Sequence, residues 1–203
     1  MKVFLDVGAF RGETLKVALH PEFGFDKLYS FEPCSVPYEK LLTDYGQDPR
    51  VTHLHFGLWD ETGPFKLYGA GTSGGSVFPD KPTFTESGEA AHHIYEMCEF
   101  VRASDWFQDN VRDEDENWLK LNCEGAECDI LDDLRSTGEI DKVDVLAVAW
   151  DAEKVPSECF HKETTRREIL KYARDTNCLR IYEMTDESWL RDLLQGKLGG
   201  IPK

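Results

Sequence analysis

Residues 6–14 combine an acid and two glycines in a spacing that suits ligand binding. They read DVGAFRGET and follow the apolar run of residues 3–7, which predicts a loop between a strand and a helix. Glycine lets the backbone turn sharply and approach a ligand, and a helix start offers unbonded N–H groups and the positive end of its dipole. Because Asp6 precedes the glycines, the loop favours a cationic or amino-bearing ligand over a pyrophosphate. A tight turn without any ligand is the alternative interpretation.

This loop differs from the two common phosphate-binding motifs. A P-loop needs four residues between its glycines and a lysine after the second, whereas three residues separate Gly8 from Gly12 and Glu13 follows. The dinucleotide motif G-x-G-x-x-G lacks its middle glycine, since Ala9 and Phe10 stand near that place. The sequence therefore argues against both kinds of phosphate loop.

Glu32 is a second candidate, because it ends the apolar run of residues 28–31. It follows the glycine loop by about 20 residues, the spacing at which a carboxylate can accept hydrogen bonds from both hydroxyls of a ribose. Pro33 then restricts the direction of the chain. An acid that only complements a helix dipole is the alternative. Taken together, the loop and the acid indicate a nucleoside with a charged tail and no pyrophosphate, a description that S-adenosylmethionine fits.

Short apolar runs alternate with amphipathic segments along the chain, which is the pattern of a parallel sheet with helical crossovers. Strands are expected at residues 3–7, 28–31, 51–56, 118–123, 143–150 and 179–183. Helices are expected at residues 13–20, 36–45, 126–135, 164–176 and 186–194. We therefore predict one α/β domain over residues 1–203, with a Rossmann-like, mostly parallel, doubly wound sheet. Ligands bind such sheets at the carboxyl ends of the strands.

The middle of the chain departs from this alternation. Strands at 65–68 and 97–103 and a short helix at 104–107 surround a loop rich in glycine and serine at 69–76. They predict a β-rich, antiparallel insertion after the third strand, at about residues 62–103. Segment 69–98 is expected to act as a lid that excludes water and selects the substrate. A neighbouring subunit of a homo-oligomer is the alternative source of such a cap.

Charge and cysteine content exclude several classes of protein. The chain has 39 Asp and Glu against 23 Lys and Arg, a net charge of −16, which disfavours nucleic acid and anionic membrane surfaces as partners. No apolar run is long enough to cross a bilayer. The six cysteines include no C-x-x-C pair, so neither a zinc site nor any other metal site is predicted. An acid at position 6 argues against a signal peptide, and we expect a cytoplasmic location.

The motifs together resemble the class I S-adenosylmethionine-dependent methyltransferases and, more narrowly, the FkbM family. Four segments carry the resemblance: residues 4–14 (FLDVGAFRGET), 29–33 (YSFEP), 55–60 (HFGLWD) with Gly63, and 118–127 (WLKLNCEGAE). The first and fourth segments are the specific ones, and the likeness extends over roughly residues 3–150. It implies S-adenosylmethionine as cofactor. The cofactor-binding residues that it implies are Asp6, Gly8, Gly12, Thr14, Glu32, Pro33, Gly57 and Leu58.

The resemblance also implies that the segment from residue 121 to 127 borders the site of methyl transfer. Candidate catalytic residues are Asn122, Glu124 and Asp151, and His92 and His93 are further candidate bases. The chain departs from the family pattern in two places. Asn122 stands where the family usually has an aspartate, so the position keeps its shape and loses its charge. The family's acid-x-His motif is replaced by residues 148–151, which read VAWD.

Three functions follow from these observations. The first is O-methylation of a small hydroxylated, sugar-like acceptor, in which the protein mainly aligns the acceptor with the methyl group. The second, motivated by Asn122, is a cofactor-binding module that has lost turnover. The third is a nucleotide-dependent oxidoreductase, which the missing central glycine argues against. The net charge favours a neutral or cationic small-molecule acceptor over an anionic one.

Overall fold

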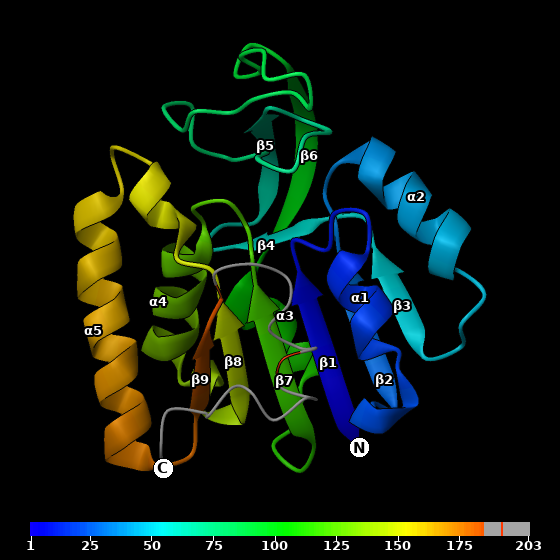
Figure 1. Ribbon diagram of the computed structural model, residues 1–203. Coiled ribbons are helices and arrows are strands. Elements are labelled where there is room, and N and C mark those ends of the chain that lie inside the picture. The colour runs from blue at the N-terminus through cyan, green and yellow to red at the C-terminus, as the bar shows by residue number, and fades with distance from the viewer. Residues whose placement is uncertain (185–191, 193–203) are drawn as a thin grey trace.

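A six-stranded parallel sheet forms the centre of the molecule (Figure 1). The computed structural model of the chain describes residues 1–184 and 192. In that part the sheet order is β3-β2-β1-β7-β8-β9, and every neighbouring pair of strands is parallel. The strands are β1 (Lys2–Val7), β2 (Lys27–Phe31), β3 (Val51–Leu54), β7 (Glu116–Leu121), β8 (Val145–Val148) and β9 (Arg180–Glu183). The predicted Rossmann-like α/β architecture is confirmed.

The strand order reverses beside β1. The chain passes from β1 outward to β2 and β3, and later returns to the other side of β1 as β7. The register pairs Val7 with both Phe31 and Leu121, so the loops after β1, β2 and β7 leave the sheet side by side. This is the point at which open α/β sheets bind their ligands, because the loops diverge there and leave space between them.

Helices cover both faces of the sheet, as its apolar strands require. They are α1 (Glu13–Ala18), α2 (Ser35–Tyr45), α3 (Ala103–Asn110), α4 (Glu127–Thr137) and α5 (Cys159–Thr176), with short 3-10 turns at Pro21–Phe23, Glu139–Lys142 and Asp151–Lys154. Side chains such as Leu5 and Leu121 pack on one face with α3, α4 and α5. On the opposite face, Phe4 and Leu28 pack with α1 and with Leu41 of α2. Among the described residues, no helix combines the length and apolar character that a membrane crossing requires.

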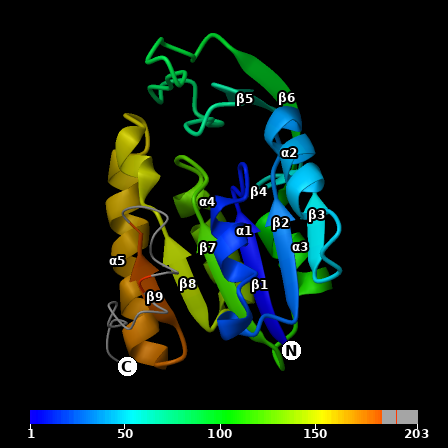
Figure 2. The same cartoon turned by 45° about the vertical axis from the view of Figure 1, so that its right-hand side comes forward.

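A smaller sheet stands above the carboxyl ends of the main strands (Figures 1 and 2). It contains β4 (Gly57–Trp59), β5 (Gly63–Tyr68) and β6 (Tyr95–Arg102) in the order β4-β6-β5. Residues 69–94 connect β5 to β6 and extend over the same end of the molecule (Figure 2). The predicted β-rich insertion after the third strand is therefore present.

The insertion differs from the expected antiparallel arrangement. β5 pairs with β6 antiparallel, but β4 pairs with β6 parallel, with Gly57 opposite Phe100. β4 was not predicted, because its three residues are too few to show a periodic pattern. The third strand was expected to reach residue 56 but ends at Leu54, since the chain turns there to enter β4.

Helix α5 begins earlier than predicted. α5 starts at Cys159 rather than at residue 164. Residues 159–163 read CFHKE and carry no apolar stripe, and Phe160 is 82% exposed, so hydrophobic periodicity gave no signal for this first turn. The helix predicted over residues 186–194 lies outside the described residues, apart from residue 192.

Candidate functional site

A cavity of about 620 Å³ lies at the carboxyl ends of β1, β2 and β7, beneath the insertion. This volume falls within the range of roughly 300–1,000 Å³ that is typical of small-molecule sites. Its lining includes Gly8 and Phe10 after β1, Glu32 and Pro33 after β2, Gly57 and Leu58 of β4, Asn122 and Glu124 after β7, and insertion residues 71–75 and 81–84. Most of the site residues predicted from the sequence therefore line one cavity.

The glycine loop is held from below by a buried ion pair. Asp6 and Lys120 lie opposite each other in the β1–β7 register, and Lys120 Nζ is 2.9 Å from Asp6 Oδ1. Lys120 Nζ also donates hydrogen bonds to the carbonyl oxygens of Val7 at 3.3 Å and of Gly8 at 2.7 Å. Asp6 is fully buried and does not line the cavity. Its negative charge is thus directed at Lys120, which in turn fixes the backbone that enters the glycine loop.

Gly8 brings the loops after β1 and β7 into close contact. Its φ of 75° lies in the left-handed region, and a Cβ atom there would lie 2.0 Å from the carbonyl oxygen of Asn122. Any side chain at position 8 would force these two loops apart, because both contacting groups belong to the backbone. The half-buried Asn122 lines the cavity beside this contact.

Glu32 joins the loops that follow β1 and β2. Its Oε2 accepts a hydrogen bond from the Phe10 N–H at 2.9 Å, and its Oε1 accepts one from the Cys34 N–H at 2.8 Å. Burial raises the pKa of Glu32 to about 7, although both backbone hydrogen bonds act to lower it. Each carboxylate oxygen has a second lone pair, so the group can still accept hydrogen bonds from a ligand in the cavity.

The wall contributed by β4 is apolar. Leu58 is buried and lines the cavity, and Gly57 beside it packs against the Phe100 ring, which a Cβ atom would meet at 2.4 Å. Phe31, at the end of β2, does not line the cavity. It lies instead in the core, with its ring centroid 4.8 Å from that of Trp106. Leu58 therefore offers an apolar contact from one side.

A cluster of acids and lysines forms the opposite wall. Lys81 of the insertion is only 3% exposed, and its Nζ lies 2.5 Å from Glu124 Oε2 and 3.1 Å from the carbonyl oxygen of Gly74. Glu124 has a φ of 56°, and its own carbonyl oxygen accepts a hydrogen bond from the Ser76 hydroxyl at 2.7 Å. Burial raises the pKa of Glu124, and the positive charge of Lys81 opposes that rise.

Two further acids lie behind Glu124. Glu127 is fully buried, and its carboxylate accepts hydrogen bonds from the N–H groups of Cys123 at 2.7 Å and Gly125 at 3.0 Å. Burial raises the pKa of Glu127 to about 8, and the nearby charge of Asp151 adds to this effect. Asp151 pairs with Lys154 at 2.6 Å, and it is Lys154, not Asp151, that lines the cavity. The wall thus presents positive as well as negative groups to a ligand.

The insertion is fastened to the main domain at several places. Glu96 of β6 accepts hydrogen bonds from the Ser35 N–H at 3.1 Å and from the Cys34 thiol at 3.0 Å, at the start of α2. Asp80 accepts one from the Ser157 N–H at 2.9 Å, and Arg11 pairs with Glu86 at 2.8 Å. Together with the Lys81–Glu124 pair, these contacts hold residues 71–84 along the cavity.

Four predicted site residues lie away from the cavity lining: Asp6, Gly12, Thr14 and Asp151. Gly12 has a φ of 89°, and a Cβ atom there would lie 2.4 Å from the Tyr45 ring, so this glycine allows α1 to approach α2. Thr14 is buried within α1. The candidate bases His92 and His93 are exposed and do not line the cavity. Any effect of these residues on a ligand would be indirect.

Sequence reasoning missed Lys120, Lys81 and Glu96. Lys120 had a recognisable signal, since a single lysine in the apolar run WLKL must find an anionic partner if that strand is buried. Lys81 and Glu96 had none. Their partners Glu124 and Cys34 lie 43 and 62 residues away along the chain, and the path of the insertion between them has no regular pattern.

Comparison with solved structures shows a similarity in fold to a methyltransferase. No family model matches the sequence, and no curated protein matches it. The crystal structure of methyltransferase FkbM from Methylobacillus flagellatus KT has 18% sequence identity to this chain and a TM-score of 0.49. The superposition covers 81% of this chain and 36% of that one, so the chain spans little more than a third of the length of the FkbM methyltransferase to which its fold is similar.

Proposed function

We propose that the chain binds S-adenosylmethionine in the cavity and transfers its methyl group to a small hydroxylated acceptor. The observation that carries this proposal is the position of Glu32. It is a buried carboxylate at the end of β2 that lines the cavity beside the glycine loop. A ribose offers two neighbouring hydroxyls to such a carboxylate, and the sequence resemblance to class I methyltransferases supports the same assignment.

The residues at the cavity fit this cofactor. Glu32 keeps one acceptor lone pair on each oxygen for a ribose. Leu58 and the neighbouring Gly57 offer an apolar surface to an adenine ring. Gly8 has no side chain to occupy the part of the cavity where the loops after β1 and β7 meet.

Bound S-adenosylmethionine supplies an electrophilic methyl group on a sulfonium, and the chain's own residues have to align the acceptor with it. An acceptor hydroxyl has to lose its proton, which requires a base beside the cavity. Glu124 is a carboxylate in that position, and burial raises its pKa above the usual value. Asn122 lies beside it and can orient a hydroxyl through its amide without taking a proton.

The first test is calorimetric titration of the protein with S-adenosylmethionine. We expect saturable binding by the wild type, and a loss of about tenfold or more in affinity in Glu32→Gln, because the amide can no longer accept from both backbone N–H groups and the ribose. The matched control is Glu39→Gln, which changes an exposed glutamate of α2. Absence of binding by the wild type at millimolar ligand would exclude the proposal.

A cofactor-binding module without turnover is the second candidate function. Two observations favour it: the neutral Asn122 lines the cavity, and Glu124 is already paired with Lys81 at 2.5 Å. Incubation with radiolabelled S-adenosylmethionine and a panel of sugars, polyols and amines distinguishes the two. Labelled product supports the enzyme, whereas tight binding without any transfer supports the module.

A further inference from the structure

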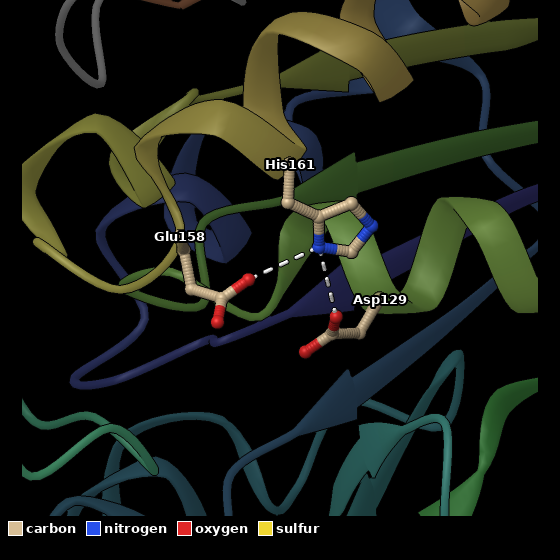
Figure 3. A group of neighbouring side chains, drawn as sticks. All are labelled: Asp129, Glu158 and His161. Carbon is tan, nitrogen blue, oxygen red and sulfur yellow. Dashed lines mark hydrogen bonds and ion pairs between the residues drawn. The ribbon is translucent and has the colours of Figure 1, made fainter.

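His161 is surrounded by carboxylates near the start of α5, where α5 contacts α4. Its Nδ1 atom lies 3.0 Å from Glu158 Oε2 and 3.4 Å from Asp129 Oδ1 (Figure 3). Glu158 precedes α5, whereas Asp129 belongs to the first turn of α4. Residues from two helices and a connecting segment thus direct three potential ligand atoms toward one point, and these atoms all lie within 4.8 Å of one another.

Asp132 fixes the orientation of the imidazole from the far side. Its Oδ2 is 2.7 Å from His161 Nε2 and also accepts a hydrogen bond from the Thr165 hydroxyl at 2.8 Å. If Nε2 carries the proton that is donated to Asp132, Nδ1 presents a lone pair to the two carboxylate oxygens. A lone pair and two anions at these distances repel each other unless a cation lies between them. That cation is either a second proton on the ring or a metal ion.

We propose that His161 Nδ1, Asp129 and Glu158 bind one divalent transition-metal ion of the Zn²⁺ class. Zinc–nitrogen and zinc–oxygen bonds of about 2.0–2.2 Å place neighbouring ligands of a tetrahedral ion about 3.3 Å apart. The two distances from Nδ1, 3.0 and 3.4 Å, are close to this separation before any ion is bound. Little movement of the side chains is therefore needed to bind the ion.

The surrounding groups support the ligands as outer-shell partners do in known metal sites. Asp132, His161 and the ion would form a carboxylate–histidine–metal series, which fixes the tautomer and makes the imidazole a stronger ligand. The indole N–H of Trp59 donates to Asp129 Oδ2 at 2.8 Å, which leaves Oδ1 directed at His161. Each of these two candidate ligands is therefore held in place by a hydrogen bond from outside the cluster.

The donor set indicates the class of ion. One imidazole nitrogen and two carboxylate oxygens suit Zn²⁺ and similar transition metals, whereas Mg²⁺ and Ca²⁺ prefer oxygen ligands alone. The side chains of Asp129, Glu158 and His161 remain 14%, 20% and 35% exposed, so water can complete the coordination. The sequence predicted no zinc site because it contains no C-x-x-C pair. That criterion detects only sites with cysteine ligands, and this cluster contains no cysteine.

Such an ion would link α4 to the start of α5. The segment just before α5 contains Lys154, which lines the cavity, and Ser157, which anchors the insertion through Asp80. The ion would therefore stabilise the wall of the cavity without contacting a ligand in it. Its role is structural, and its binding can be measured independently of methyl transfer.

The test is a titration of metal-free protein with Zn²⁺, followed by calorimetry and by the melting temperature. We expect saturable binding of one Zn²⁺ per chain and a higher melting temperature, because the ion binds the folded chain. His161→Gln should weaken binding by about tenfold or more, and Asp132→Asn by about 10–100-fold through loss of orientation alone. Asp129→Asn provides a second ligand variant, and melting of each metal-free protein checks that it folds.

Two controls separate this site from adventitious binding. His92→Gln changes an exposed histidine, and Cys159→Ser changes an exposed cysteine two residues from His161; both should retain the wild-type affinity. Substitution with Co²⁺ should give visible ligand-field bands without a thiolate charge-transfer band. Absence of saturable Zn²⁺ binding, unchanged affinity in His161→Gln, or loss of binding in Cys159→Ser would each overturn the proposal.

Discussion

Burial raises the pKa of the Glu32 carboxyl group to about 7. The affinity for a ligand that hydrogen-bonds to this group should therefore depend on pH. A ribose hydroxyl donates to the ionised form, so binding should strengthen as the pH rises through about 7. If only the ionised form binds, the dissociation constant for S-adenosylmethionine falls by up to about tenfold between about pH 6 and 8. Calorimetry across that range measures this change. The slope should vanish in Glu32→Gln, and an equal slope in that variant would assign the effect to another group.

The same shift has the opposite consequence for folding. The pKa of Glu32 is raised from 4.5 to about 7, so between these pH values the folded chain holds a proton that the unfolded chain has released. The contribution of Glu32 to stability is therefore fully present at low pH and is lost as the pH rises through about 7. Glu32 thus favours ligand binding in the pH range where it favours folding least.

The buried pair of Asp6 and Lys120 should be essential to stability as a pair. Either Asp6→Asn or Lys120→Met removes one member of this buried ion pair, and each should destabilise the protein by about 3–5 kcal/mol. The double variant should lose clearly less than the sum of the two single variants, because it leaves neither charge. Urea denaturation of all four proteins gives this cycle, and strict additivity would show that the two side chains do not interact.

Residues differed in how well the sequence predicted their place relative to the cavity. Glu32 and Gly8 could be predicted because each lies at a fixed place after a strand, and parallel strands bring those places together. Asp6 was expected to act toward the ligand, whereas the structure directs it at Lys120, since cross-strand pairing cannot be read from one strand alone. Asp151 belongs to an acidic cluster, but its neighbour Lys154 reaches the cavity instead.

At the level of elements, the insertion is the part that sequence reasoning described least well. Hydrophobic periodicity identified the long strands and helices, because burial on a regular element imposes a repeating pattern. β4 has three residues, and residues 69–94 are held by isolated polar contacts that impose no repeat. The place of the insertion could be predicted from its glycine and serine content. Its fastening by Lys81, Asp80 and Glu96 could not.

The Lys81–Glu124 pair should control how often the insertion opens. Lys81→Met removes the ion pair with the half-buried Glu124 and the hydrogen bond to Gly74, so local opening should become easier. We expect limited proteolysis within residues 69–94 to accelerate by about tenfold or more, since cleavage follows the population of the open form. Mass spectrometry of the fragments locates the cuts.

Lys66→Met is the matched control for this experiment. Lys66 lies on β5, and its exposed side chain lies over the Tyr95 ring of β6. Unlike Lys81, it is not paired with a carboxylate of the main domain in the described part of the chain. Its loss should leave the cleavage rate unchanged. Equal acceleration in both variants would indicate general loosening of the insertion rather than release of the Lys81 contact.

For the whole molecule, the net charge of −16 is a poor guide to the cavity. The charged side chains that line it are Glu32, Glu124, Lys81 and Lys154, which balance one another. The acidic excess therefore lies elsewhere on the molecule. We therefore expect the charges that line the cavity, rather than the overall charge, to govern which acceptor binds.

The position of the insertion also sets the order in which the chain can fold. The central strand β1 needs β7 as its partner, and Lys2 pairs with Glu116 across the whole intervening chain. At roughly 5–20 residues per second, a ribosome makes β7 about 6–23 s after β1. During that interval the edge of β1 that later binds β7 has no native neighbour. Nascent chains should therefore depend on chaperones until residue 121 has emerged. In vitro, the formation of the long-range pairing between β1 and β7 should limit the rate of refolding.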